Sequence, residues 1–220
     1  MDRLRWAGVA AIGVMWAGVG ASVLRAGFPL AGDLPLSRLA EDARASALFG
    51  PTLALGALLF LAFGADVVER YPVRLDFAVL LVAGMVGQLV AGIVSIGPAG
   101  SSDPVHVSAA LILGATIPVF LWRFAAAQPA GPWRRRSYAL FAAQLAATVV
   151  GIVLSQRHVA PLAEIVPAVF FHLWVAVVTF HRPAEASPRS PSTAAGLHTA
   201  ADDRSPRPLV VEPMPVPPRS

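Results

Sequence analysis

The stretch FAVLLVAGMVGQLVAGIVSI, Phe77–Ile96, decides the fold class of this chain. It carries no charged side chain, and its length matches the roughly 20 mainly apolar residues that a helix needs to cross a bilayer. Five further stretches share this character, and no long alternation of apolar and polar residues indicates a β-barrel. We therefore expect an all-α polytopic membrane protein with six transmembrane helices in a compact bundle. The expected helices span residues 6–24, 45–65, 77–96, 107–126, 138–155 and 162–180.

The composition of the whole chain agrees with this fold class. Of its 220 residues, 56% are hydrophobic and 14% are charged, whereas soluble domains have about 25% charged residues. There is no cysteine, which excludes disulfides and thiolate chemistry. The basic residues are all Arg and lie beside the apolar stretches rather than on one soluble face. We therefore do not expect nucleic acid as a partner, although the pI is near 10.9.

The arginines near the ends of the expected helices favour one side of the membrane. That side carries Arg3, Arg5, Arg70, Arg74, Arg123, Arg134, Arg135, Arg136 and Arg182. The opposite side carries Arg25, Arg38, Arg44 and Arg157. Because basic residues are enriched in cytoplasmic loops, we expect a multi-pass protein of the cell membrane with both termini in the cytoplasm. The first apolar stretch is longer than a usual signal-peptide core, so we expect an uncleaved helix.

The chain changes character after the last expected helix. Residues 182–220 are rich in Pro and cannot bury enough apolar surface to offset the entropy lost on ordering. We therefore expect a transmembrane domain at residues 1–181 and a disordered cytoplasmic tail at residues 182–220. The simpler interpretation of the tail is an inert segment. The alternative is that PMPVPP, residues 213–218, forms a polyproline II helix that docks on an aromatic groove.

Gln88, Gln144 and His172 lie inside the apolar stretches, where polar side chains are costly unless they face protein. Gln88 shares a stripe of small residues with Ser95, and Gln144 lies on a similar stripe of the fifth expected helix. Such stripes indicate either a packing seam between helices or a polar ligand cavity. His172 falls near mid-membrane, where a hydrogen bond to a neighbouring helix is the simpler interpretation and a ligand-binding role the alternative. Since no second histidine lies at that depth, we expect no haem and no other cofactor.

A second group of ionisable residues lies at the outer ends of the expected helices. Asp103 and His106 belong to one connection, and His158 and Glu164 belong to another. Carboxylates and imidazoles suit a divalent metal or acid–base chemistry. We hypothesise that these four residues form one outer pocket with Gln88 and Ser95 beneath it. The alternative is that Asp103 caps the helix and His106 has only a packing role.

Two stretches beside this group carry a family resemblance. AGIVSIGPAG, Ala91–Gly100, and HVSAALILGA, His106–Ala115, resemble a family of six-helix prokaryotic membrane proteins catalogued as a domain of unknown function (nine-ninety-eight). In that family a Gly-Pro loop ends the third helix and a His opens the fourth. The stretch PLSRLAE, Pro35–Glu41, resembles the start of the family's second helix, with Arg38 where an acid is common. The resemblance covers about Trp6–Arg182 and implies a fold and a membrane location, without an activity.

Three functions remain open at this level. The first is the binding or movement of a small or lipidic ligand through a polar pocket that opens on the outer face. The second is a metal-assisted membrane hydrolase that uses His106 and nearby acids, and the third is a structural or assembly role. The chain has no phosphate-binding glycine loop, nucleophile elbow or HExxH motif, so a non-enzymatic role is favoured. Membrane lipids are the expected partners, and no pattern determines an oligomeric state.

Overall fold

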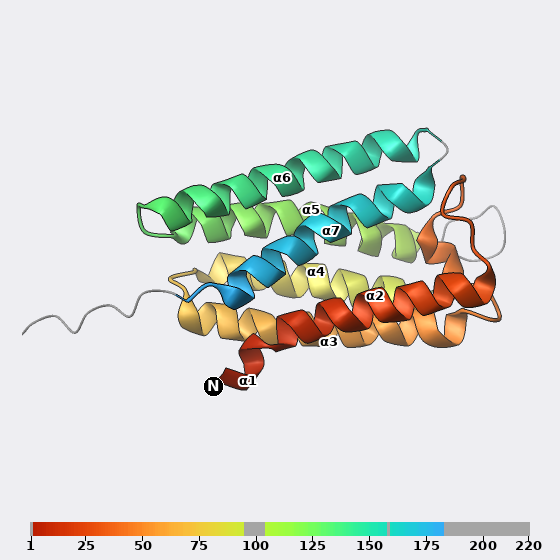
Figure 1. Cartoon of the computed structure of the whole chain (residues 1–220), viewed down its shortest axis with the longest axis horizontal. Coiled ribbons are helices and arrows are strands. Elements are labelled where there is room, and N and C mark those ends of the chain that lie inside the picture. Colours follow the sequence, from red (N-terminus) through yellow and green to blue (C-terminus); the bar gives the residue numbers. More distant parts are fainter. Residues whose placement is uncertain (1, 95–103, 158, 183–220) are drawn as a thin grey trace, which may run out of the picture. The chain divides into compact units, whose positions relative to one another are not determined.

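A computed structural model describes residues 2–94, 104–157 and 159–182 (Figure 1). Its long helices are α2 (Ala7–Ala26), α3 (Ser46–Arg70), α4 (Leu75–Ile93), α5 (Pro104–Ala127), α6 (Pro132–Ser155) and α7 (Ala160–Phe180). A short helix, α1 (Asp2–Arg5), precedes them, and a 3₁₀ helix, η1 (Leu36–Ala40), lies between α2 and α3. The six long helices are apolar and long enough to cross a membrane, and no strand occurs in the described ranges. The predicted all-α fold with six spans is confirmed.

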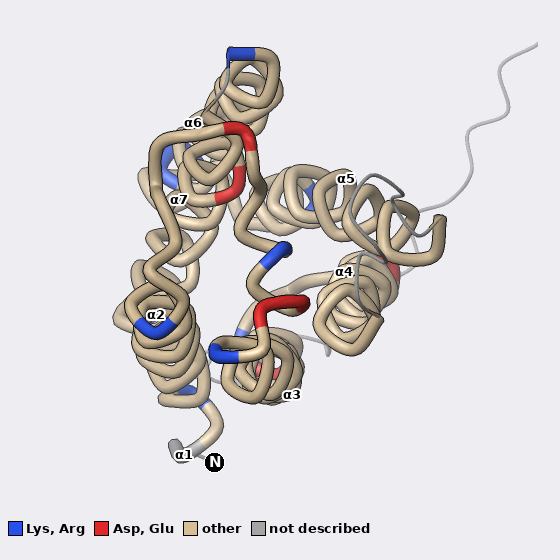
Figure 2. The backbone as a smooth tube through the Cα atoms, turned by 90° about the vertical axis from the view of Figure 1, so that its right-hand side faces the viewer, with Lys and Arg blue, Asp and Glu red and all other residues tan. Residues whose placement is uncertain are grey.

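The six spans form a ring. Each long helix packs against the next one in the chain, and α7 returns to pack against α2 (Figure 2). The connection between α2 and α3, which contains η1, crosses the middle of the ring at one end, seen in front in Figure 2. This end is termed the η1 end. The opposite end, where α3 turns into α4 and α5 into α6, is termed the Tyr71 end.

Two helices, α3 and α6, extend furthest beyond their predicted bounds. α3 continues to Arg70 rather than ending near Ala65, because Arg70 Nε donates a hydrogen bond of 2.7 Å to Asp66 Oδ2 one turn earlier. α6 begins at Pro132 rather than near Tyr138, since proline is favoured in the first turn of a helix. The apolar pattern identifies the part of a helix that suits hydrocarbon, whereas the helix itself can extend further.

The half of the ring nearer the Tyr71 end is filled by aromatic side chains. The aromatic side chains with 1% exposure or less are Phe60, Phe63, Phe77, Phe120, Phe124 and Trp174. They come from α3, α4, α5 and α7. Phe124 packs edge-on against Trp174 at 5.3 Å between ring centroids and against Tyr71 at 5.0 Å. This cluster, termed the aromatic core, joins α3, α5 and α7 directly.

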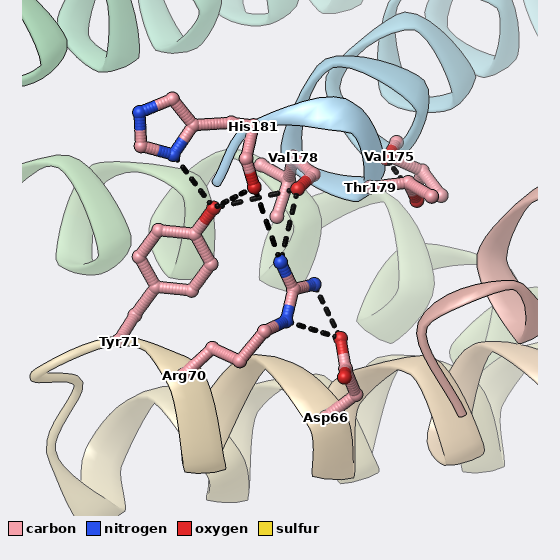
Figure 3. Close-up of polar contacts among 7 residues, drawn as sticks. All are labelled: Asp66, Arg70, Tyr71, Val175, Val178, Thr179 and His181. Atoms are coloured by element: carbon pink, nitrogen blue, oxygen red, sulfur yellow. Dashed lines mark hydrogen bonds and ion pairs between the residues drawn. The ribbon is translucent and has the colours of Figure 1, made fainter. Parts of the chain in front are cut away.

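Polar contacts beside the aromatic core hold the end of α7 to α3 (Figure 3). Arg70 Nη1 donates to the carbonyl oxygens of Val178 and His181 at 3.4 and 3.3 Å. The Tyr71 hydroxyl lies 3.3 Å from the Val178 carbonyl oxygen and 3.0 Å from His181 Nδ1. The last carbonyl groups of a helix lack partners within the helix. Asp66, Arg70 and Tyr71 therefore form a clamp that satisfies the end of α7.

Glycines on α4 allow close contacts with α3 and α5. A Cβ atom at Gly87 would lie 2.7 Å from the Ala109 carbonyl oxygen of α5, and one at Gly92 would lie 2.8 Å from Leu53 Cβ of α3. These glycines form the packing seam that was one interpretation of the small-residue stripe.

Candidate functional site

A cavity of about 480 Å³ lies inside the ring toward the η1 end. It is lined by residues of η1 and of all six long helices, and most of the lining side chains are apolar. The side chains with hydroxyl, amide, imidazole or carboxyl groups in the lining are Ser37, Gln88, His106, Gln144, Thr148, Ser155, Glu164 and His172. No Arg belongs to the lining that the structure describes. The cavity is thus an apolar chamber with a few uncharged polar groups and one carboxyl group.

Five of the eight residues singled out from the sequence line this cavity. They are Gln88, His106, Gln144, Glu164 and His172. They lie on α4, α5, α6 and α7, so the ring brings together side chains that are far apart along the chain. The other three, Ser95, Asp103 and His158, lie outside the described residues.

His106 links two helix ends. The residue is 6% exposed, and its Nδ1 lies 3.0 Å from the carbonyl oxygen of Val94, the residue after α4. A carbonyl oxygen only accepts hydrogen bonds, so Nδ1 carries the hydrogen and Nε2 of the neutral ring is an acceptor. This contact satisfies a carbonyl at the end of α4, so His106 has a structural role while it also lines the cavity.

Glu164 holds η1 over the cavity. Ser37 Oγ donates a hydrogen bond of 3.5 Å to Glu164 Oε1, and the carboxylate also interacts with the backbone N–H groups of Leu36 and Ser37. These N–H groups belong to the first turn of η1 and have no partner within it. A backbone bond of 2.9 Å from the Ala160 N–H to the Gly32 carbonyl oxygen joins the same connection to α7. The α2–α3 connection is therefore fastened to the beginning of α7.

Gln88 has a partner for its amide donor. Its Nε2 lies 3.0 Å from the Leu53 carbonyl oxygen of α3, and the residue is 6% exposed. The bond joins α4 to α3 at the wall of the cavity. Gln88 thus belongs both to the packing seam and to the cavity lining, which the sequence analysis treated as alternatives.

Gln144 and His172 each hold a polar atom that has no hydrogen-bond partner in the described part of the chain. These atoms are Gln144 Oε1 and His172 Nδ1, and the residues are 1% and 7% exposed. The His172 ring stacks on Phe60 at 5.5 Å and meets Trp16 edge-on at 5.6 Å. Its Nδ1 therefore lacks the hydrogen bond to a neighbouring helix that the sequence analysis favoured. Buried polar atoms usually have partners, so both atoms need a physical explanation.

Several lining residues of α5 and α6 are also exposed at the surface of the bundle. Ile152 of α6 lines the cavity while 62% exposed, and Ser155 of the same helix is also exposed. On α5, Gly114 is an exposed lining residue whose Cβ would meet no atom within 4 Å.

The described residues contain no group of three or more His, Cys, Asp or Glu side chains able to hold a metal ion. His106 is bonded to the end of α4 and Glu164 to η1. Both residues were candidate metal ligands in the sequence analysis, and in the structure both form hydrogen bonds within the protein instead.

Trp16 of α2 is a lining residue that the sequence analysis missed. It lies mid-span, whereas Trp is usually enriched at the membrane boundary. The mid-span position of Trp16 could have indicated its place in the lining, because the indole N–H group at that depth needs a polar neighbour or a cavity.

The family model described as "Protein of unknown function (DUF998)" matches residues 4–181. The chain belongs to this family. The resemblance found in the sequence is thereby confirmed, and the match covers all six spans of the DUF998 bundle. No curated protein and no solved structure matches the chain.

Proposed function

We propose that this DUF998 protein binds a small, mainly apolar or lipidic ligand within the membrane, in the cavity at the η1 end. The observation that carries the proposal is the cavity itself. Its volume of about 480 Å³ and its apolar lining with a few polar groups correspond to ligand sites, which measure about 300–1,000 Å³. A ligand would also supply partners for Gln144 Oε1 and His172 Nδ1.

The packing of the two halves supports this proposal. Protein interiors are close-packed, and a void forfeits contacts between the side chains that line it. The aromatic core fills its half of the ring with six nearly inaccessible rings. In the half toward η1, small residues such as Ala91, Ala110 and Ala168 line the interior instead. A ligand in the cavity would restore the contacts that these small residues leave unmade.

The route to the cavity indicates the source of the ligand. Because lining residues of α5 and α6 are exposed at the surface of the bundle, at Gly114 and Ile152, the ligand enters sideways from the bilayer. The α2–α3 connection covers the η1 end of the ring and is fastened by Glu164. Entry between helices suits a hydrophobic molecule that is already dissolved in the membrane.

Recovery of ligand from the purified protein tests the proposal. The full chain is extracted into lipid nanodiscs, and native mass spectrometry is expected to show a retained small molecule. Gly114→Phe should obstruct the opening and lower ligand occupancy, because the backbone there has room for a side chain: a Cβ meets no atom within 4 Å. Gly13→Phe is the matched control, since Gly13 has the same open surroundings but does not line the cavity. Equal occupancy in both variants, or no retained molecule in the parent protein, would contradict the proposal.

We also propose that the protein lies in the cell membrane with the Tyr71 end and both termini in the cytoplasm. Arginines lie over aromatic rings in four pairs: Arg5–Trp6, Arg70–Tyr71, Arg123–Trp122 and Arg134–Tyr138. All four belong to the Tyr71 end, and Arg beside boundary aromatics is typical of the cytoplasmic side. Reporter fusions at Ser192 and at Asp42 should report opposite sides. The same side for both would contradict this orientation.

A further inference from the structure

The polar atoms of the cavity select the chemistry of its ligand. We infer that the ligand is a neutral lipid alcohol whose hydroxyl group binds between Gln144 Oε1 and His172 Nδ1. This inference rests on the proposed ligand binding and adds a substrate class to it. Four observations carry it: the level of the two residues, the orientation of the Gln144 amide, the surroundings of His172 and the charge of the lining.

The two residues lie at the same level of neighbouring antiparallel helices. A Cβ at Gly151 of α6 would lie 2.7 Å from the Ala163 carbonyl oxygen and 3.0 Å from Pro167 Cγ, so Gly151 stands opposite this segment of α7. Two helical turns, about 11 Å, separate Gly151 from Gln144. The same distance along α7, which runs the opposite way, leads from that segment to His172. Both residues line the cavity, while Gln144 Oε1 and His172 Nδ1 are themselves covered by neighbouring side chains. A small side-chain adjustment on binding turns the two atoms toward the cavity, where one small group contacts both.

The orientation of the Gln144 amide follows from its neighbour. Thr148 Oγ1 donates to the Gln144 backbone carbonyl oxygen at 3.0 Å, which uses the hydroxyl hydrogen. Thr148 Oγ1 is therefore an acceptor for the Gln144 side chain, and the group 3.4 Å away is Nε2. This leaves Oε1, which only accepts, without a partner among the described residues. The ligand must bring a hydrogen-bond donor to this position.

His172 completes the site. Phe60 stacks on the His172 ring and Trp16 meets it edge-on, so the plane of the imidazole is fixed. With its hydrogen on Nδ1, the ring donates to the oxygen of the ligand hydroxyl, while the hydroxyl hydrogen goes to Gln144 Oε1. A hydroxyl group is both donor and acceptor, so one group satisfies both buried atoms. A hydrocarbon satisfies neither, and it would leave two buried polar atoms unpaired.

The charge of the lining excludes ionic head groups. No Arg lines the described cavity and the chain contains no Lys, so a carboxylate or phosphate would have no cationic partner. A carboxylate would also place oxygen lone pairs against Gln144 Oε1. An ammonium group at Gln144 would be unpaired, because Glu164 lies eight residues, about 12 Å, from His172 along α7 and is bonded to η1. Unpaired charge within a membrane is costly, so a neutral group is favoured.

A matched series of probes tests the ligand class. Dodecanol, dodecanoate, dodecylamine and dodecane share one chain and differ in the head group. Binding to the full chain in nanodiscs is measured by native mass spectrometry and by the shift in melting temperature. Dodecanol is expected to bind about tenfold more tightly than dodecane, the gain from pairing buried polar atoms. The two ionic probes should bind more weakly than dodecanol.

Variants connect the preference to the two residues. Gln144→Met and His172→Phe keep the size and apolar contacts of the side chains and should abolish the preference for dodecanol over dodecane. Thr179→Val is the control, because it removes a buried hydroxyl whose 2.8 Å bond to Val175 lies outside the cavity. It should keep the preference. A melting transition like that of the parent protein shows that each variant is folded.

The outcomes separate the two proposals. Binding of none of the four probes would contradict ligand binding in the cavity and this inference with it. Equal binding of dodecane and dodecanol would leave the proposed function standing and overturn the lipid alcohol. A preference for dodecanoate or dodecylamine, or a dodecanol preference that survives both variants, would also overturn it.

Discussion

The two halves of this DUF998 bundle use the same six helices in opposite ways. Toward the Tyr71 end, Phe124 and Trp174 interlock with other rings at 0% and 1% exposure. Toward the η1 end, small residues surround a cavity whose lining includes Gln144 and His172. One half is closed by close-packed rings and by the clamp at the end of α7, and the other half encloses the cavity. The difference indicates that stability is concentrated in the half that does not hold the candidate site.

The largest expected effect is the loss of a ring from the aromatic core. Phe124→Ala should lower the free energy of unfolding by about 3–5 kcal/mol, because it leaves a hole among Tyr71, Phe77 and Trp174. Ile117→Ala, at the cavity wall, should cost clearly less, since its surroundings are already open. Equilibrium unfolding in mixed micelles measures both. Equal losses of unfolding free energy in the two variants would show that the two halves do not differ in packing.

The next effect concerns the clamp at the end of α7. Arg70→Gln should cost about 2–3 kcal/mol, because it leaves the buried Asp66 carboxylate and the Val178 carbonyl without their charged partner. Arg74→Gln, at the start of α4, is the matched control and should change stability little. Hydrogen exchange of the last turn of α7 should increase in the Arg70 variant alone. An unchanged exchange rate there would show that the clamp does not hold this end.

A smaller effect should appear at alkaline pH. Burial raises the pKa of Tyr71 from 10.0 to about 12, so the folded chain binds this proton more tightly than the unfolded chain. The stability from this group is present below pH 10 and is lost as the pH rises toward 12. Tyr71→Phe should cost about 1 kcal/mol at neutral pH and should remove part of the alkaline loss. Parallel alkaline slopes for the two proteins would contradict this.

The smallest expected change in stability is at the candidate site. Gln144→Met should leave the unfolding free energy of the ligand-free protein within about 1 kcal/mol of its original value, because the lost Oε1 has no partner among the described residues. Gln88→Met, which breaks the 3.0 Å bond to the Leu53 carbonyl oxygen, should cost more. Thermal unfolding in nanodiscs compares the two. A large loss for Gln144→Met would show that this residue stabilises the fold rather than awaiting a ligand.

The sequence by itself determined the six spans and the interior side chains. A helix that crosses hydrocarbon must satisfy its own backbone, so a sufficiently long apolar run identifies it without reference to other segments. Polar groups in such a run must face protein, which correctly indicated an interior place for Gln88, Gln144 and His172. These conclusions depend on local composition and helical periodicity alone.

Only the tertiary structure decided how those side chains are used. The Nδ1 bond from His106 to Val94, the contact of Glu164 with η1 and the mid-span place of Trp16 in the cavity each depend on contacts between distant segments. The close approach of Gly151 to Ala163 and Pro167 sets the register between α6 and α7, and with it the relative level of Gln144 and His172. Helical periodicity determines which face a residue occupies, but the register between two helices results from packing along their whole length, and no single stretch of sequence contains it.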